Sequence, residues 1–478
     1  MRIGELTHRK RDSSAERPMS QTMAEKDTES VDLVVIGTGA AGTAAATRCR
    51  KEGWRVAIVD DEPFGGTCAL RGCDPKKVLV GEADILDAYR RMRGFGLHGD
   101  DARIDWPALM RFKRTFTEPV PEKRAAAFRE AGINAYHGPA RFADENTLLV
   151  GTERIDARHF LVASGAEPRP LGIPGEEHVK TSTDFLELDV LPKRLVLIGA
   201  GYIAFEFAHI ARRAGVDVVM FGRGRALTQF DEDLVDRLVD HTTAIGVDVR
   251  LNAPVTSVVP KGGELRVHFQ RGIGHDDSVS ANLVIHAAGR VPKTRHLALD
   301  RASVKTDNRG AVDVNEYLQS VSNPRVYAAG DAALPNGSVP LTPVAAHEGL
   351  IVASNLLHGN TNKSNYRGVP SVVFTVPPLA RVGMSESDAR AQGLAVRVKS
   401  DNTGEWLSNR RTRQTAAMFK TIVEEDTDRV LGAHLLGPGA EEVINLFALA
   451  IRHEIKARDL AHMLYAYPTS TSDIAYML

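Results

Sequence analysis

The stretch Val31-Asp32-Leu33-Val34-Val35-Ile36-Gly37-Thr38-Gly39-Ala40-Ala41-Gly42 decides the fold of the first part of the chain. Its first six residues form a nearly continuous apolar run, which is typical of a strand buried inside a parallel sheet. The glycines open a small-residue helix expected over Thr43–Glu52, and a second strand, Val56–Val59, ends at Asp60. A strand, Gly-x-Gly-x-x-Gly, a helix, a strand and an acid together form a dinucleotide-binding unit.

Each residue of this unit has its own task. Gly37 makes the tight turn, Gly39 lets the backbone approach a pyrophosphate, and Gly42 packs the helix against the strand. The helix N-terminus attracts phosphate, and the Asp60 carboxylate can accept hydrogen bonds from ribose hydroxyls. The first part of the chain is therefore predicted to bind a dinucleotide.

A second unit of the same kind starts with a strand at Arg194–Ile198, continues with the turn Gly199-Ala200-Gly201-Tyr202-Ile203-Ala204, and has a helix expected over Phe205–Ala214. No acid closes this unit, and Arg223 and Arg225 follow its second strand instead. Arginines suit a 2′-phosphate, whereas an acid pairs with a free 2′-hydroxyl. NADPH is therefore favoured over NADH as the second dinucleotide, the alternative being that both arginines are solvated loop charges.

Length and composition limit the remaining interpretations. A chain of 478 residues with 43% hydrophobic residues indicates a globular protein of about three domains, at ~150 residues each. The net charge of −1 gives no electrostatic reason to expect nucleic acid or a membrane surface as partner. No apolar run reaches the ~18 residues of a membrane span. Only three cysteines argue against a secreted disulfide scaffold and favour a reducing, cytoplasmic compartment.

Two of those cysteines lie five positions apart in Gly65-Gly66-Thr67-Cys68-Ala69-Leu70-Arg71-Gly72-Cys73-Asp74-Pro75-Lys76-Lys77, ahead of a helix expected over Val78–Arg91. Pro75 fits a first helical turn, and a thiol at a helix N-terminus is favoured as thiolate. Two structural cysteines, or half of a zinc site, are the alternatives. Zinc needs four ligands and the only other cysteine is Cys49, so a redox-active Cys68–Cys73 pair is favoured and no metal site is predicted.

Three later strands end in glycine, which is where a backbone often approaches a ligand. They are Phe160–Gly165, which includes Ser164, Val284–Gly289, and Val326–Asp331, which includes Gly330. From about Tyr366 the pattern changes to antiparallel strands followed by a helix, which indicates an α+β domain. Its expected elements are Val369–Thr375, Ala416–Val423, Val430–Leu436 and Ala440–His453.

Together these motifs resemble the FAD-dependent pyridine nucleotide-disulfide oxidoreductases, the family of glutathione reductase, dihydrolipoyl dehydrogenase and mercuric reductase. The resemblance covers nearly the whole chain after residue 30 and includes Ala288–Pro292 and Leu341–Val344. It implies an α/β fold with two Rossmann-like dinucleotide-binding domains and a C-terminal α+β dimerisation domain. The boundaries expected are a disordered tail over 1–30, an FAD-binding domain over 31–170 and 291–365, an NAD(P)H-binding domain over 171–290, and a dimerisation domain over 366–478.

The resemblance also implies site residues. FAD is expected at Gly37, Gly39, Gly42, Asp60, Gly66, Thr67, Lys77, Ser164, Gly165, Gly330, Asp331 and Thr342. NADPH, with NADH as the alternative, is expected at Gly199, Gly201, Tyr202, Ile203, Glu206, Arg223, Arg225 and Gly289.

The same resemblance implies a path for electrons, from NADPH to the flavin and then to the disulfide. Cys73 is implied to face the flavin and Cys68 to attack the substrate. Lys77 is implied to lie beside the reactive nitrogen of the flavin with Glu206 as its partner, and Tyr202 to gate the nicotinamide pocket. A homodimer is implied, in which the cysteines of one subunit meet the C-terminal segment of the other.

The chain departs from the family at the C-terminal segment. Family disulfide reductases carry His-Pro-Thr-x-x-Glu there, whereas this chain has Tyr467-Pro468-Thr469-Ser470-Thr471-Ser472, with Asp473 one position late. A tyrosine pKa of ~10 lies about 3.5 units above that of histidine, so Tyr467 is a poor general base. His462 is a candidate substitute. Mercuric reductases also tend to carry tyrosine near this position, but their C-terminal cysteine pair is absent from this sequence.

The cysteine stretch departs as well. Asp74 follows the flavin-facing cysteine where the family has an apolar residue, and like-charge repulsion is expected to raise the pKa of Cys73. Arg71 and Lys76 are expected to oppose that effect.

Three functions fit this sequence. The first is an NADPH-dependent flavoprotein that reduces a disulfide or another thiol-reactive acceptor through Cys68 and Cys73, with Tyr467, Lys77 and Glu206 in supporting roles. The second is a metal-ion or quinone reductase that uses the same cysteines without a histidine base. The third is a redox-sensing flavoprotein whose turnover is incidental.

Overall fold

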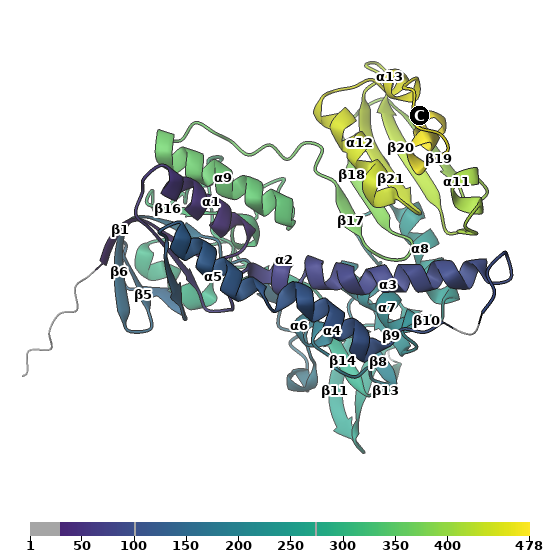
Figure 1. Ribbon diagram of the computed structural model, residues 1–478, viewed down its shortest axis with the longest axis horizontal. Helices are drawn as coiled ribbons and strands as arrows, with labels where there is room; N and C mark the ends of the chain where they lie inside the picture. The colour runs from purple at the N-terminus through teal and green to yellow at the C-terminus, as the bar shows by residue number, and fades with distance from the viewer. Residues whose placement is uncertain (1–28, 100–101, 273–274) are drawn as a thin grey trace, which may run out of the picture.

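The computed structural model describes residues 29–99, 102–272 and 275–478 (Figure 1). The predicted tail over 1–30 lies outside the described residues except for Glu29 and Ser30, which are already the first two residues of strand β1, Glu29–Ile36. Among the described residues, no helix is long and apolar enough to cross a membrane.

The first dinucleotide unit forms the centre of a seven-stranded sheet of order β3-β2-β1-β6-β5-β4, with β16 paired to β6. β1 lies parallel to both β2 and β6, so its Leu33, Val34 and Val35 are completely buried. Helices α1 and α9 lie side by side on one face in Figure 1. The elements are α1 Ala40–Lys51, β2 Val56–Asp60, α4 Trp106–Thr117, α5 Val120–Glu130, β3 Asn134–His137, β4 Ala140–Phe142, β5 Thr147–Val150, β6 Glu153–Val162, β16 Val326–Ala328 and α9 Thr342–His358.

The second unit forms a four-stranded parallel sheet of order β10-β9-β8-β14, beside a three-stranded antiparallel sheet β11-β12-β13. A two-stranded ladder of β7 and β15 connects this region back to the first one. The elements are β7 Ala166–Pro168, α6 Ser182–Leu186, β8 Arg194–Ile198, α7 Tyr202–Arg213, β9 Asp217–Phe221, α8 Glu232–Ala244, β10 Val247–Arg250, β11 Val255–Lys261, β12 Glu264–Gln270, β13 Asp276–Ala281, β14 Leu283–His286 and β15 Arg290–Pro292.

The C-terminal part is a five-stranded antiparallel sheet of order β17-β18-β21-β20-β19, packed against α12. The apolar core of this part includes Phe419 of the sheet and Ile444 and Phe447 of α12. The elements are β17 Ser371–Val373, β18 Leu379–Gly383, α10 Glu386–Ala391, β19 Val396–Asn402, α11 Leu407–Arg410, β20 Met418–Glu424, β21 Val430–Leu436, α12 Ala440–Arg452, α13 Ala457–Ala461 and α14 Ile474–Met477. Two dinucleotide units and a C-terminal α+β part confirm the predicted α/β fold.

The helices begin earlier than the sequence indicated. Helices α1 and α7 start directly after their N-cap residues Gly39 and Gly201, so the last three residues of each expected turn are already helical. The helix expected from Val78 is α3, Cys73–Met92, and it accommodates Pro75 in its first turn. Cys68 belongs to a separate short helix, α2, Gly66–Arg71, which was not predicted. The long α3 runs across the middle of the molecule, between the C-terminal sheet and α4 (Figure 1).

Candidate active site

The first glycine turn is closed by contacts that only glycine allows. Gly37 has a φ of +110°, and a Cβ there would lie 2.2 Å from the carbonyl oxygen of Ala163 on the neighbouring strand. A Cβ on Gly42 would lie 2.0 Å from the carbonyl oxygen of Gly37, so helix α1 packs directly on the turn. A Cβ on Gly66 would lie 2.5 Å from Cα of Gly39. The cysteine stretch therefore packs backbone to backbone against this turn.

Thr38 connects the turn to Asp60, and sequence reasoning missed it. Its N–H and its hydroxyl both donate to Oδ2 of Asp60, at 2.7 and 2.6 Å, while its hydroxyl oxygen accepts the N–H of Gly65 at 3.0 Å. The N–H of Glu62 donates to the other Asp60 oxygen at 3.0 Å. Each carboxylate oxygen can accept more than one hydrogen bond, so these contacts still allow Asp60 to accept from a ribose hydroxyl. That role of Asp60 stays a prediction.

A cavity of about 200 Å³, which we call the thiol cavity, brings together predicted residues from five separate segments. Both cysteines line it, together with side chains of α7 and the N-terminus of α9. The predicted residues among its lining are Gly39, Thr67, Cys68, Cys73, Gly165, Tyr202, Ile203, Glu206, Gly330, Asp331 and Thr342. Lys76, Arg71 and Arg290 supply its cationic groups. Gly37, Gly42, Asp60, Gly66, Ser164 and Lys77 are not in this lining.

The two cysteines are free thiols in the structure, and their surroundings shift their pKa values in opposite directions. A hydrogen bond from Cys68 lowers the pKa of Cys73 to about 6, with further help from the charge of Lys76 and the hydroxyl of Thr342. The hydrogen bond to Cys73, together with burial, raises the pKa of Cys68. These opposite shifts favour the thiolate form of Cys73 and the thiol form of Cys68.

The predicted effect of Asp74 on Cys73 is wrong. The first turn of α3 directs the Asp74 carboxylate toward Cys68, whose Sγ donates to Oδ1 at 3.8 Å, and it is the pKa of Cys68 that the Asp74 charge raises. Lys76 favours the Cys73 thiolate as expected, whereas Arg71 lies 3.7 Å from Glu62 in an ion pair.

The predicted pairing of Lys77 with Glu206 is also wrong, because the structure gives that partner to Lys76. Nζ of Lys76 lies 2.7 Å from Oε1 of Glu206, with only 9% and 3% of the two side chains exposed. Lys76 shares the buried face of α3 with Leu79, Val80 and Ala83, whereas Lys77 is one residue further round the helix and exposed. Nζ of Lys77 lies 4.0 Å from the ring centre of Phe374.

Phe374, in the segment between β17 and β18, is a second site residue that sequence reasoning missed. Its N–H donates to Oε1 of Glu206 at 2.8 Å, and its ring centre lies 4.5 Å from Nζ of Lys76. An ammonium group over an aromatic face is attracted by the ring. The C-terminal part of the chain thus supports the Lys76–Glu206 pair directly.

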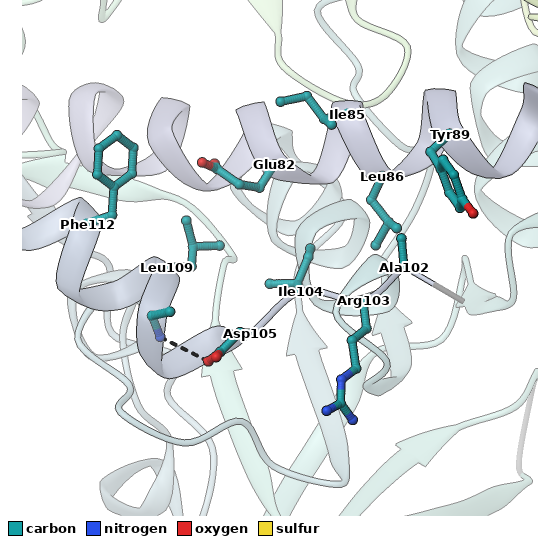
Figure 2. A pocket seen from close by; sticks show the side chains of 11 residues that line it. Glu82, Ile85, Leu86, Tyr89, Ala102, Arg103, Ile104, Asp105, Leu109 and Phe112 are labelled. Carbon is teal, nitrogen blue, oxygen red and sulfur yellow. Dashed lines mark hydrogen bonds between the residues drawn. The ribbon is translucent and has the colours of Figure 1, made fainter. Parts of the chain in front are cut away.

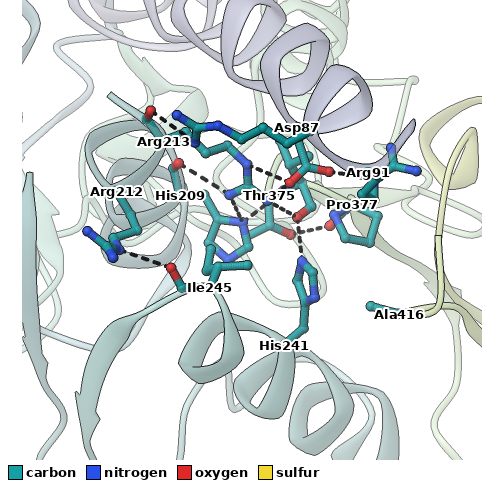
Figure 3. Close-up of polar contacts among 12 residues, drawn as sticks. Asp87, Arg91, His209, Arg212, Arg213, His241, Ile245, Thr375, Pro377 and Ala416 are labelled. Carbon is teal, nitrogen blue, oxygen red and sulfur yellow. Dashed lines mark hydrogen bonds and ion pairs between the residues drawn. The ribbon is translucent and has the colours of Figure 1, made fainter. Parts of the chain in front are cut away.

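A buried polar network about three turns further along α3 fixes this helix to α7 (Figure 3). Asp87 of α3 pairs with Arg213 of α7 at 2.8 Å, and Arg213 also donates to the carbonyl of Val376 at 2.9 Å. The N–H of Val376 donates to Nδ1 of His209 at 3.0 Å, and burial holds the pKa of His209 well below its ordinary value. Because a charged Arg213 is buried with its partner, losing either member would be costly, and the network holds the helix of Cys73 in place.

A larger cleft of about 880 Å³ lies at the second glycine turn, and we call it the glycine-rich cleft. Gly199, with φ of +134°, closes the turn against Ala287, while a Cβ on Gly201 would meet no atom within 4 Å. Gly199, Gly201, Tyr202, Ile203, Arg223, Arg225 and Gly289 all line this cleft, as predicted. Tyr202 and Asp331 line both cavities and therefore lie between them.

The two arginines of this cleft differ. Arg225 pairs with Glu232 at 2.8 Å, whereas Arg223 is exposed and makes no ion pair or hydrogen bond with the described residues. Arg223 is thus the arginine of the two whose charge is available to an anion in the cleft.

The predicted C-terminal residues do not meet the cysteines within one chain. Tyr467 is 75% exposed, and neither it nor His462 lines the thiol cavity. His462 bonds through Nδ1 to the carbonyl of Arg458, and the Asp473 carboxylate accepts from the hydroxyl of Ser408. Within this chain, Asp473 therefore has another partner than Tyr467.

A further cavity of about 500 Å³ between α3 and α4 contains none of the predicted site residues (Figure 2). Leu86 and Tyr89 of α3 line it together with Leu109 and Phe112 of α4, and Asp105 caps the first turn of α4 by accepting the N–H of Ala108 at 3.1 Å.

Comparisons with known proteins agree with this geometry. Residues 31–349 match the family model described as pyridine nucleotide-disulphide oxidoreductase, and residues 369–477 match its dimerisation domain. The chain is 34% identical to a glutathione reductase of Burkholderia cepacia, over 92% of this chain and 96% of the relative. It is 33% identical to a mercuric reductase of Staphylococcus aureus, over 92% and 80%. The structure resembles the Cu(II) complex of the HOCl-induced flavoprotein disulfide reductase RclA of Escherichia coli, with a TM-score of 0.84, 27% identity and coverage of 94% and 99%.

Members of this family use FAD and NAD(P)H, and the residues present fit both. The hydroxyl of Ser164, beside the first glycine turn, is buried without a partner among the described residues, which fits a polar ligand at that position. Gly330 and Asp331 are fixed by the buried Glu348, which accepts the N–H of Gly330 at 2.6 Å. Two glycine turns, one at each cavity, provide two phosphate-binding helix N-termini.

The matched domains, the relatives and the paired thiols lead to one conclusion. The chain belongs to the pyridine nucleotide-disulphide oxidoreductase family, as an FAD-dependent NAD(P)H oxidoreductase that carries the dimerisation domain of that family.

Proposed function

We propose that this enzyme is an NADPH-dependent reductase of a disulfide or another thiol-reactive acceptor, working through Cys68 and Cys73 in a reducing compartment such as the cytoplasm. One observation carries the proposal: the two thiols share a cavity in which one is stabilised as thiolate and the other as thiol. Bound FAD supplies two-electron chemistry between the nicotinamide and the sulfur pair.

The chain's own residues divide the remaining work. The glycine turn at Gly37 and Gly39 and the hydroxyl of Ser164 would hold FAD beside the thiol cavity, with Lys76 in the place first assigned to Lys77. Lys76 and Thr342 hold the negative charge on Cys73. Cys68 keeps a proton that has to leave before its sulfur can attack, because the thiolate is the nucleophile.

The homodimer would complete the site. We propose that Tyr467 of the partner subunit lies at the mouth of the thiol cavity, where a neutral hydroxyl can donate a hydrogen bond but cannot act as an efficient base. The 75% exposure of Tyr467 in a single chain, within a matched dimerisation domain, supports this arrangement.

The choice of NADPH predicts unequal effects of the two cleft arginines. An Arg223→Ser variant is expected to raise the KM for NADPH by about 10- to 100-fold, the value of a charge-assisted hydrogen bond of ~1.5–3 kcal/mol, and to leave the KM for NADH unchanged. Arg225→Ser, the matched control, is expected to have a smaller effect because Arg225 already pairs with Glu232. Steady-state kinetics with both nucleotides measures this, and an equal change for NADPH and NADH would contradict it.

The acceptor is tested by NADPH oxidation against a panel of oxidised glutathione, lipoamide, Hg(II), Cu(II) and quinones. A disulfide is expected to give the highest kcat/KM. Reduction of a metal ion is the second candidate, favoured by tyrosine at position 467 and by the resemblance to a mercuric reductase and to a structure solved with Cu(II). Slow turnover with every acceptor, combined with a thiol-dependent change in oligomeric state, would favour the redox-sensing alternative.

A further inference from the structure

Asp74 occupies a position that neither cofactor explains. It is exposed and is not among the residues lining the thiol cavity, while Cys68 does line that cavity. The Asp74 carboxylate therefore lies on the outer side of the Cys68 sulfur, with Oδ1 3.8 Å from Sγ and placed to accept its proton.

The break between α2 and α3 creates this contact. Gly72 separates the two helices with φ of −141° and ψ of −119°, and a Cβ there would lie 2.8 Å from the carbonyl oxygen of Thr67 and 3.2 Å from Cα of Cys68. The close return of the chain at Gly72 sets the first turn of α3 against α2. Asp74 and Lys76, on either side of Pro75, then serve different sulfurs: Asp74 contacts Cys68, and Lys76 acts on Cys73.

The C-terminal segment of this sequence lacks an efficient proton acceptor for the thiol that attacks the substrate. Tyr467 stands where the family's disulfide reductases have their histidine, and a tyrosine hydroxyl is a poor proton acceptor at neutral pH. We propose that Asp74 is a catalytic residue, whose carboxylate accepts the proton of Cys68 as that sulfur attacks the acceptor disulfide and passes it to the leaving sulfur. This inference rests on the proposed disulfide reductase function.

The step balances as a thiol–disulfide exchange. The Cys68 sulfur forms a bond to one sulfur of the acceptor, the sulfur–sulfur bond of the acceptor breaks, and the departing thiolate takes the proton held by Asp74. The Cys73 thiolate then attacks Cys68, which closes the Cys68–Cys73 disulfide and releases the second acceptor thiolate. Two electrons leave the Cys68 thiol and the Cys73 thiolate and reduce the acceptor to one thiol and one thiolate.

Other charged groups surround the sulfurs and must be separated from Asp74. The titratable groups are Cys73 and Lys76 on α3, Arg71 on α2, Tyr202 and Glu206 on α7, Arg290 on β15 and Asp331 in the short 3-10 helix Gly330–Ala332, and the neutral hydroxyl of Thr342 on α9 lies among them. Cys68 has one thiol proton, which can be donated either to the Cys73 sulfur or to the Asp74 carboxylate, and its sulfur accepts a hydrogen bond from Thr342. Asp74 is the carboxylate on the outer side of Cys68 among these described residues, so its replacement tests it alone.

A structural role for Asp74 makes the opposite prediction. An acid in the first turn stabilises a helix through its macrodipole, and its charge repels a thiolate on Cys68. If those were its only effects, Asp74→Asn would lower the pKa of Cys68 and leave disulfide turnover at pH 7 unchanged or faster.

The test measures both properties on the holoenzyme. Alkylation of Cys68 by iodoacetamide against pH, followed by peptide mass spectrometry, is expected to show a more acidic thiol in Asp74→Asn. Disulfide turnover at pH 7 is nevertheless expected to fall by about 100-fold, the usual value of a positioned acid–base group, and to recover toward the parent as the pH rises. Asp74→Glu keeps the carboxylate and is expected to stay within about threefold of the parent.

Three results would overturn the proposal: turnover of Asp74→Asn equal to or above that of the parent at pH 7, an equal loss in Asp74→Glu, or a parallel loss in the reduction of bound FAD by NADPH. The last would place the defect before Cys68 acts. Failure of the proposed function would look different, because the parent itself would then turn over no disulfide.

Discussion

A Cys68→Ser variant is expected to lose turnover with disulfide acceptors by about 100-fold or more, because a serine hydroxyl at neutral pH cannot replace a thiol as nucleophile. Reduction of the bound flavin by NADPH is expected to persist, since the glycine-rich cleft and Cys73 are unchanged. Rapid mixing with NADPH in the absence of acceptor measures the first half of the reaction as loss of the absorbance of oxidised flavin. Steady-state assays with oxidised glutathione and lipoamide measure the second half.

Cys49→Ala is the matched control for removing one thiol. Cys49 is buried on α1, burial raises the pKa of its thiol to about 12, and it lines neither cavity, so this variant is expected to turn over like the parent. A Cys68→Ser enzyme that reduces disulfides at the parental rate would contradict the proposed function. A loss of flavin reduction in the same variant would show that Cys68 acts earlier than proposed.

The nucleotide-binding part of the site could be read from the sequence because it depends on local spacing. Gly37 and Gly199 are required by a turn that brings two strands of one sheet together, and the same pattern fixes the start of each helix. Such constraints act over a dozen residues and leave the same signature wherever the unit occurs. Both glycine turns form where the sequence predicts them, whereas the helix after each turn starts earlier than the sequence indicated.

The partners of the cysteines could not be read in that way. Lys76 and Lys77 are adjacent and chemically identical, and only the rotation of α3 against α7 decides which one reaches Glu206. The helix starts at Cys73 instead of Val78, which fixes that rotation. Phe374 lies 168 residues from Glu206 in sequence, so no local pattern could connect them. Asp74 was expected to act on its neighbour in sequence and instead contacts the cysteine of the preceding helix.

The second large effect is expected on the pKa of Cys73 when Lys76 is replaced, with the same substitution at the neighbouring Lys77 as the comparison. Lys76→Gln is expected to raise the pKa of Cys73, because it removes a stabilising cation and leaves the opposing charge of Glu206 without its partner, while the hydrogen bond from Cys68, the largest cause of the low pKa, remains. The fraction of Cys73 present as thiolate at pH 7 falls accordingly, so alkylation of Cys73 at that pH is expected to slow by about threefold or more.

Lys77→Gln removes the same charge one position away. It is expected to leave the rate of Cys73 alkylation unchanged, since Lys77 is exposed and lies over the ring of Phe374. Lys76→Gln also leaves a buried carboxylate unpaired, at a cost of ~3–5 kcal/mol in the free energy of unfolding, so folding is checked by circular dichroism before alkylation. Lys76→Arg retains the cation and is expected to keep the pKa of Cys73 low. Equal alkylation rates for Lys76→Gln and Lys77→Gln would contradict this prediction. They would show that Lys76 does not specifically stabilise the Cys73 thiolate, and Lys77 would again be the candidate for the lysine beside the flavin.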